Sequence, residues 1–149
     1  MRTNSISRFA TAVGALWALG FVGSCSSADA SSGSFPETPY SLTTTASGKL
    51  AIALSTAPSQ PPNAGVDAVE LMLTDPATGK PIDGETITLV PWMPLMGHGT
   101  DMIPEVQPMG NGRYVVTDVN LYMPGEWLLT FAFNGKVTES AWKITFDVP

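Results

Sequence analysis

The sequence has few of the residues that most chemical sites need. It contains one cysteine and one histidine in 149 residues, and only 13% of its residues are charged. A single cysteine excludes an intramolecular disulfide framework and a cysteine-rich metal cluster. Neither a nucleophile-elbow serine motif nor a glycine-rich phosphate loop occurs, so we expect a protein that is not an enzyme. The formal net charge of −6 makes nucleic acid a poor partner, because phosphate binding needs a cationic face.

The first 24 residues predict a signal peptide. Arg2 and Arg8 precede a short apolar run, residues 9–22, whereas a membrane-spanning helix needs about 20 apolar residues. The run ends at Val22-Gly23-Ser24-Cys25, which resembles the lipobox of bacterial lipoproteins. This resemblance implies that Cys25 is lipidated and anchors the chain to the membrane of the bacterial cell envelope, facing the periplasm. The alternative is an ordinary signal peptide with a chance cysteine.

The remainder of the chain divides into a tether and one domain. Residues 25–47 are rich in Ser and Thr and lack periodicity, which predicts a flexible tether. From residue 48 to residue 149, short apolar alternations such as Trp127, Leu129, Phe131 and Phe133 are separated by turn signals, and no helical period persists. About seven such segments predict an all-β domain, an immunoglobulin-like antiparallel β-sandwich.

Residues 91–109 are the unusual segment. They contain Met93, Met96, Met102 and Met109, four of the seven methionines, together with His98. Thioether sulfur and imidazole suit Cu(I), and they suit hard cations poorly. Met96 and His98 are two residues apart and would share a face in extended chain. We therefore predict a Cu(I) site at Met93, Met96, His98 and Met102. Met109 and Met123 are reserve ligands, which could bind the ion in place of one of these four. Alternatively, the methionines plug the open end of the sandwich and His98 bonds a backbone carbonyl.

Three motifs carry a family resemblance. They are Met93-Pro94-Leu95-Met96-Gly97-His98-Gly99, Gly112-Arg113-Tyr114 and Met123-Pro124-Gly125-Glu126-Trp127. Together they resemble the YtkA-like domain family, which is related to FixH, over about residues 48–148. The resemblance implies an immunoglobulin-like fold in an exported or membrane-anchored protein. Because the family also occurs attached to heavy-metal efflux adaptors, it further implies copper handling or the assembly of copper-containing oxidases.

Two functions from different classes follow. The first is a cell-envelope lipoprotein that binds or transfers Cu(I) through the loop around His98. The second is a non-catalytic interaction module that binds another envelope protein without metal, with Trp92, Met93 and Met96 as the docking patch.

Overall fold

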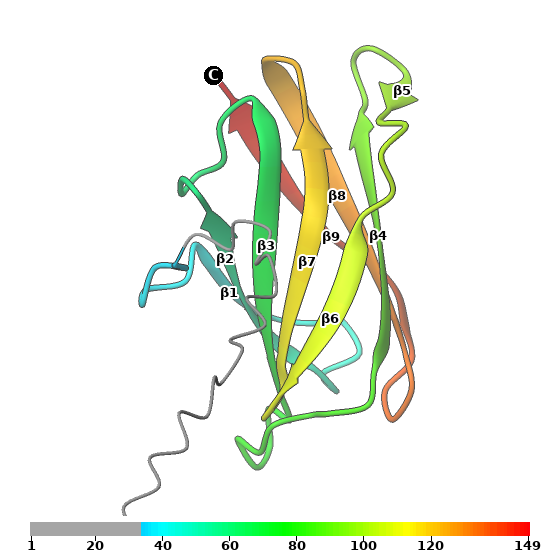
Figure 1. Ribbon diagram of the computed structural model, residues 1–149. Helices are drawn as coiled ribbons and strands as arrows, with labels where there is room; N and C mark the ends of the chain where they lie inside the picture. The colour runs from blue at the N-terminus through cyan, green and yellow to red at the C-terminus, as the bar shows by residue number, and fades with distance from the viewer. Residues whose placement is uncertain (1–33) are drawn as a thin grey trace, which may run out of the picture.

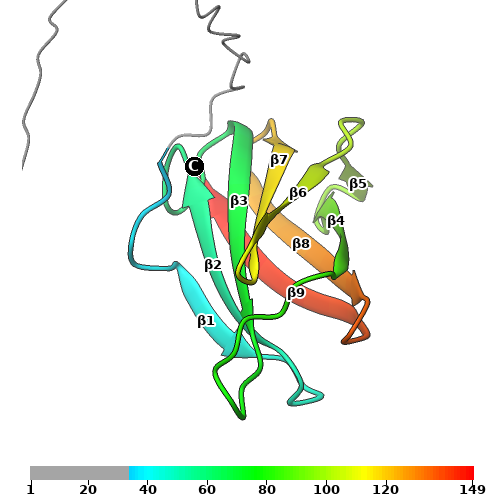
Figure 2. The same cartoon turned by 60° about the horizontal axis from the view of Figure 1, so that its bottom comes forward.

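Residues 34–149, which the computed structural model describes, form two antiparallel β-sheets that face each other (Figures 1 and 2). The strands are β1 (Ser41–Thr44), β2 (Ala51–Ala57), β3 (Gly65–Thr74), β4 (Thr86–Met93), β5 (His98–Gly99), β6 (Glu105–Gly110), β7 (Arg113–Leu121), β8 (Gly125–Asn134) and β9 (Glu139–Val148). The predicted signal peptide and Cys25 lie outside the described residues. Within residues 34–149, no helix is long and apolar enough to cross a membrane.

The strand order confirms the predicted sandwich. One sheet has the order β1-β2-β3-β7-β6 and the other β5-β4-β8-β9. Without β1 and the two-residue β5, seven strands remain, arranged four and three as in a constant-type immunoglobulin domain. The additional two strands extend one edge of each sheet, so the described part of the chain has nine strands instead of about seven.

The predicted tether boundary is wrong, because β1 lies inside residues 25–47. β1 pairs antiparallel with β2, and the N–H of Tyr40 donates to the carbonyl of Leu54 at 2.7 Å. As an edge strand, β1 exposes most of its side chains, including Leu42. A strand of this kind needs no apolar alternation, so its sequence resembles a linker. The folded sheet therefore begins at Ser41 rather than at residue 48.

The apolar alternation of β8 builds the centre of the core. Trp127, Leu129, Phe131 and Phe133 all point inward and are almost completely buried. Each buried large apolar side chain contributes roughly 1.5–3 kcal/mol to folding. Opposite them lie the inward-facing residues of the larger sheet, such as Leu71 on β3. Trp127 is the largest of the fully buried side chains.

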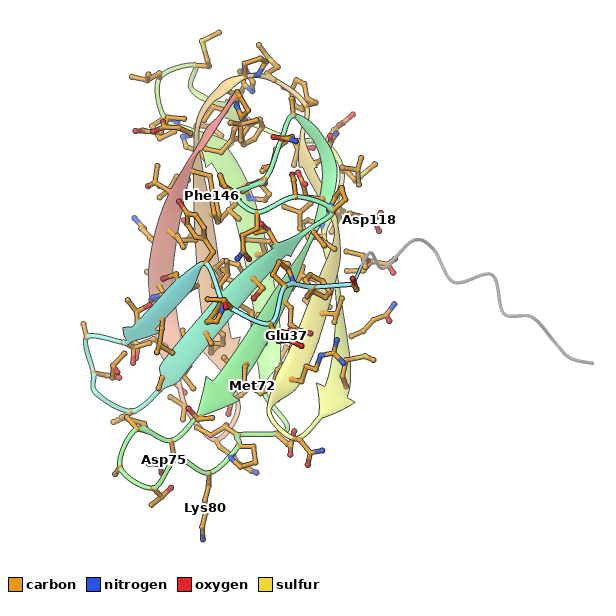
Figure 3. All side chains as sticks on the ribbon, turned by 90° about the vertical axis from the view of Figure 1, so that its left-hand side faces the viewer. Glu37, Met72, Asp75, Lys80, Asp118 and Phe146 are labelled. Atoms are coloured by element: carbon orange, nitrogen blue, oxygen red, sulfur yellow. The ribbon has the colours of Figure 1, made fainter. Side chains whose placement is uncertain are left out.

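The two ends of the sandwich differ. At one end the β6–β7 turn, Asn111-Gly112, has positive φ angles of 54° and 73°, as a type I′ turn requires. There Gly112 N–H donates to Asp83 Oδ1 at 2.7 Å, and the connection from Asp75 to Lys80 folds into a tight turn (Figure 3). At the other end β4, β7 and β9 finish and β8 begins, close to β5 (Figure 1). We call this second end the β5 end.

Asp67 is a buried carboxylate near the β5 end. It shares with Val69 and Leu71 the face of β3 that packs into the core, and its Oδ2 has no hydrogen-bond partner among the described residues. β7 carries a bulge opposite this position, where Asp118 (labelled in Figure 3) adopts a positive φ of 59°. Burial disfavours the charged form and raises the pKa of Asp67 from 3.8 to about 6.

Asp67→Asn is expected to change how stability depends on pH. Because the folded-state pKa lies above the unfolded value, this group costs the wild type stability as the pH rises from about 4 to about 6. Asparagine cannot ionise, so the variant should gain on the wild type across that window, by at most about 3 kcal/mol at pH 7. Urea unfolding at a series of pH values measures the difference. Two parallel pH profiles would contradict this description of Asp67.

Candidate metal-binding site at the β5 end

A tight hairpin carries the methionine-rich segment. β4 ends at Met93, the chain turns through residues 94–97, and β5 returns alongside β4. Gly97 N–H donates to the carbonyl of Met93 at 2.9 Å, and Gly97 has a φ of 68°, which glycine adopts without strain. Met96 lies within this turn and not in a strand. The expectation that Met96 and His98 share a face of extended chain is therefore wrong, because the turn intervenes.

Glycine at position 99 lets β5 lie against β4. In the register of the hairpin, Gly99 is opposite Trp92. A Cβ atom at Gly99 would be 2.7 Å from the carbonyl oxygen of Pro91 and 3.3 Å from Cε3 of Trp92. A backbone contact this short cannot be relieved by a side-chain movement. The close pairing of β5 with β4 therefore requires a residue without a side chain.

Met93 and His98 are direct cross-strand partners. Opposed residues of an antiparallel pair point to the same face, with Cβ atoms about 5 Å apart. Met93 is buried in the core, and its Cε lies 3.0 Å from the position that a Cβ of Gly125 would occupy. His98 is half-buried above the β7–β8 connection, which directly precedes Gly125, and its ring stacks on Tyr122 with centroids 6.0 Å apart. The hairpin thus brings one predicted thioether ligand next to the imidazole.

The hydrogen bonds of His98 define its neutral tautomer. Nδ1 lies 3.1 Å from the carbonyl oxygen of Gly99 and 3.1 Å from Oη of Tyr122. A carbonyl oxygen only accepts, and an unprotonated Nδ1 at that distance would place two lone pairs against each other. We therefore assign the proton to Nδ1, which leaves the lone pair on Nε2. The hydrogen bond to a backbone carbonyl that we considered as an alternative is present, and it leaves Nε2 as the nitrogen that can bind a metal.

Tyr122 is the site residue that sequence analysis missed. It lies between β7 and β8 and packs edge-on against Trp127, with centroids 5.7 Å apart. The indole N–H of Trp127 donates to the carbonyl of Met123 at 2.9 Å. The signal in the sequence was the position of Tyr122 directly before the Met-Pro-Gly-x-Trp motif. That motif lies beside His98, so Met123 belongs to the same region of the structure.

The remaining predicted ligands are distributed unevenly. Met96 in the turn and Met102 after β5 are both exposed, on either side of His98 along the chain. Met109 is near the far end of β6, beside the start of β7. β7 has nine residues and is about 30 Å long, and its other end carries Tyr122. Met109 is therefore wrong as a reserve ligand, because the direction of β6 takes it away from the β5 end.

Charge is also distributed unevenly between the two ends. Of the lysines and arginines within residues 34–149, none lies at the β5 end. Lys143 is in the middle of β9, and Lys49, Lys80, Arg113 and Lys136 lie at the opposite end, where Arg113 pairs with Glu70. Carboxylates lie near both ends: Asp67, Asp101, Glu105, Glu126 and Asp147 are near the β5 end, without a basic side chain of the described residues beside them, and Asp75, Asp83, Glu85 and Glu139 are at the opposite end. The field at this end therefore favours cations.

The fold and the hairpin define a β-sandwich of immunoglobulin topology with soft donor atoms at one end. The chain belongs to the YtkA-like family, whose model matches residues 44–132. Among solved structures, it is similar to a copper-bound variant of FetP from uropathogenic Escherichia coli, with a TM-score of 0.46 and 8% sequence identity, covering 72% of this chain and 91% of that one. No curated protein matches the chain.

Gly99→Ala is expected to separate β5 from β4 and to move His98 away from Tyr122, because the new Cβ meets the Pro91 carbonyl. The nuclear Overhauser contacts between the two rings should disappear, while far-ultraviolet circular dichroism stays that of the wild type. Gly97→Ala is the matched control, since a Cβ there meets no atom within 4 Å and costs only about 1–2 kcal/mol of backbone strain. Ring contacts that persist in Gly99→Ala would contradict the proposed role of this glycine.

Proposed function

We propose that this protein binds Cu(I) reversibly at the β5 end, in a binding rather than a catalytic role. His98 Nε2 and the thioethers of Met93, Met96 and Met102 are the proposed ligands. We further propose that the chain is a lipoprotein held in the cell envelope through Cys25, so that the site faces the periplasm.

The observation that carries the proposal is the placement of the only imidazole of the chain. Its Nδ1 is engaged by Gly99 and Tyr122, its Nε2 retains the lone pair, and Met93 is its direct cross-strand partner. Within residues 34–149, no group of three or more His, Cys, Asp and Glu side chains could hold a metal ion. The donors that the β5 end does offer are one imidazole and several thioethers, which is the chemistry that suits Cu(I).

Exposure and charge support exchangeable binding over permanent storage. Met96 and Met102 present their side chains to solvent on the two sides of His98 along the chain, whereas Met93 approaches from the core. A site with ligands on an exposed hairpin allows a metal ion to enter and leave without opening the sandwich. The carboxylates of the β5 end attract a cation toward it, and lysine and arginine side chains lie elsewhere in the described domain.

Anaerobic titration of Cu(I) against a competing chelator tests the proposal. All proteins carry Cys25→Ser, because a free thiol itself binds Cu(I). We expect one ion per chain, and an affinity at least about tenfold weaker in His98→Ala and in Met102→Ala, since each removes a direct ligand. Met72→Ala is the matched control, because Met72 is as exposed as Met102 (37% and 38%) but lies on β3, outside the site (Figure 3). Equal affinities in the wild type, His98→Ala and Met102→Ala would overturn the proposal.

A docking function is the second candidate, and the exposed apolar side chains of the hairpin region favour it. Of the predicted docking patch, Trp92 and Met96 are exposed, whereas Met93 is buried in the core and is wrong as a docking residue. Leu95 and Ile103, in the same stretch of chain, are 84% and 82% exposed. Large apolar side chains this exposed mark interaction sites where they form one patch. The acidic surroundings of this patch suit a partner with basic residues around an apolar centre.

Leu95→Asp combined with Ile103→Asp tests the docking function. In cells, chemical cross-linking of the wild-type lipoprotein should then recover a defined envelope protein that the double variant fails to recover, because two charges oppose burial of the patch. Cu(I) affinity should remain within about twofold of the wild type, since neither residue is a proposed ligand. Recovery of the same partner by both proteins would exclude this patch as the docking surface.

A further inference from the structure

The segment from Tyr122 to Trp127 has no assigned part in the proposed copper site, although it packs against that site. It contains the third motif of the family resemblance, Met123-Pro124-Gly125-Glu126-Trp127. It contacts two of the proposed ligands: Tyr122 touches the ring of His98, and Gly125 lies next to Cε of Met93. These contacts join residues that are 24 and 32 positions apart in the sequence.

We infer that Tyr122 is a positioning residue of the site, whose hydroxyl group, together with the Gly99 carbonyl, holds His98 in the tautomer that offers Nε2 to a metal. The inference rests on the proposed function, because it concerns the same imidazole. It assigns Tyr122 no direct bond to the metal. It also gives the Met-Pro-Gly-x-Trp motif a functional reason beyond packing, since this motif holds Tyr122 in place.

The hydroxyl group of Tyr122 contacts both Nδ1 of His98 and the carbonyl oxygen of Gly99, to which Nδ1 also donates. Oη lies 3.1 Å from Nδ1 of His98 and donates to the carbonyl oxygen of Gly99 at 3.5 Å. With its own proton directed at the carbonyl, Oη presents a lone pair to Nδ1–H. The hydroxyl thus closes a triangle with Nδ1 and the Gly99 carbonyl in which every hydrogen has an acceptor. Only the tautomer with its proton on Nδ1 fits this arrangement, because the carbonyl oxygen has no proton to donate to the ring.

Tyr122 is itself held in place by a residue of the core, Trp127. The indole of Trp127 is completely buried and meets the Tyr122 ring at an interplanar angle of 70°. The same indole donates its N–H to the carbonyl of Met123, the residue directly after Tyr122. One rigid, buried side chain therefore fixes both the ring of Tyr122 and the backbone beside it. The core therefore fixes Trp127, Trp127 fixes the orientation of Tyr122, and Tyr122 fixes that of His98.

Such a contact is expected to matter for metal affinity. Ligand histidines in metalloproteins usually donate their second ring N–H to a fixed acceptor, which sets the tautomer and the ring orientation. Loss of that acceptor typically weakens metal binding by about 10- to 100-fold. Nδ1–H of His98 has two acceptors, the carbonyl oxygen of Gly99 and Oη of Tyr122. Tyr122→Phe removes the second of them while it keeps the ring that stacks on His98 and packs against Trp127.

The experiment compares Tyr122→Phe with Tyr40→Phe, again with Cys25→Ser in every protein. Tyr40 is a matched control, because it is as exposed as Tyr122 (44% and 45%) and its ring also packs on a core aromatic residue, Phe146. The first readout is the pair of ring ¹⁵N chemical shifts of His98 in the metal-free protein, at a pH where the ring is neutral. As the only histidine of the chain, His98 gives signals that need no assignment by mutation. The second readout is Cu(I) affinity by chelator competition.

We expect the wild type and Tyr40→Phe to show one protonated nitrogen, Nδ1, and one unprotonated nitrogen, Nε2. In Tyr122→Phe the two shifts should move toward each other as the second tautomer becomes populated, and Cu(I) affinity should fall about tenfold or more. If His98→Ala weakens Cu(I) binding, then unchanged ring shifts or unchanged Cu(I) affinity in Tyr122→Phe would overturn the role of Tyr122 and leave the proposed function intact. No response of Cu(I) affinity to His98→Ala would overturn the proposed function itself.

Discussion

The burial of Trp127 is the interaction on which the β5 end depends. This side chain lies near the start of β8, an inner strand of the smaller sheet, and is completely buried. Its indole N–H would be unsatisfied in the core without the carbonyl of Met123, so the β7–β8 connection must pass close to it. That path places Tyr122 against His98 and Gly125 against Met93. The hairpin of β4 and β5 then has a fixed surface to lie on.

The architecture was predictable wherever burial imposes a pattern on the sequence. β8 is buried on one face along its whole length, so Trp127, Leu129, Phe131 and Phe133 alternate without interruption and predict the strand correctly. The turn at Asn111-Gly112 was predictable because its backbone needs residues that accept positive φ. β1 was not, because an exposed edge strand satisfies its backbone through β2 and places no demand on its side chains.

The candidate site was predictable in composition and only partly in arrangement. Clustered methionines around one histidine indicate the kind of chemistry without a structure. Which of them meet depends on the turn at residues 94–97, which makes Met93 and not Met96 the cross-strand partner of His98. The direction of β6 removes Met109, and a contact across 24 residues of sequence adds Tyr122. Such pairings arise from strand register and tertiary packing, which residue spacing does not encode.

The resulting site combines a rigid half with an exposed half. Met93 and His98 are fixed by the core and by Tyr122, whereas Met96 and Met102 face solvent at an end that carries acidic but no basic side chains within the described domain. This division suits the proposed function, in which the rigid half would set the preferred ion and the exposed half would control its exchange. X-ray absorption at the copper edge of the Cu(I)-loaded protein tests this description most directly. We expect copper bound to one imidazole nitrogen and three sulfur atoms, and copper bound to oxygen and nitrogen atoms alone would contradict the proposed site.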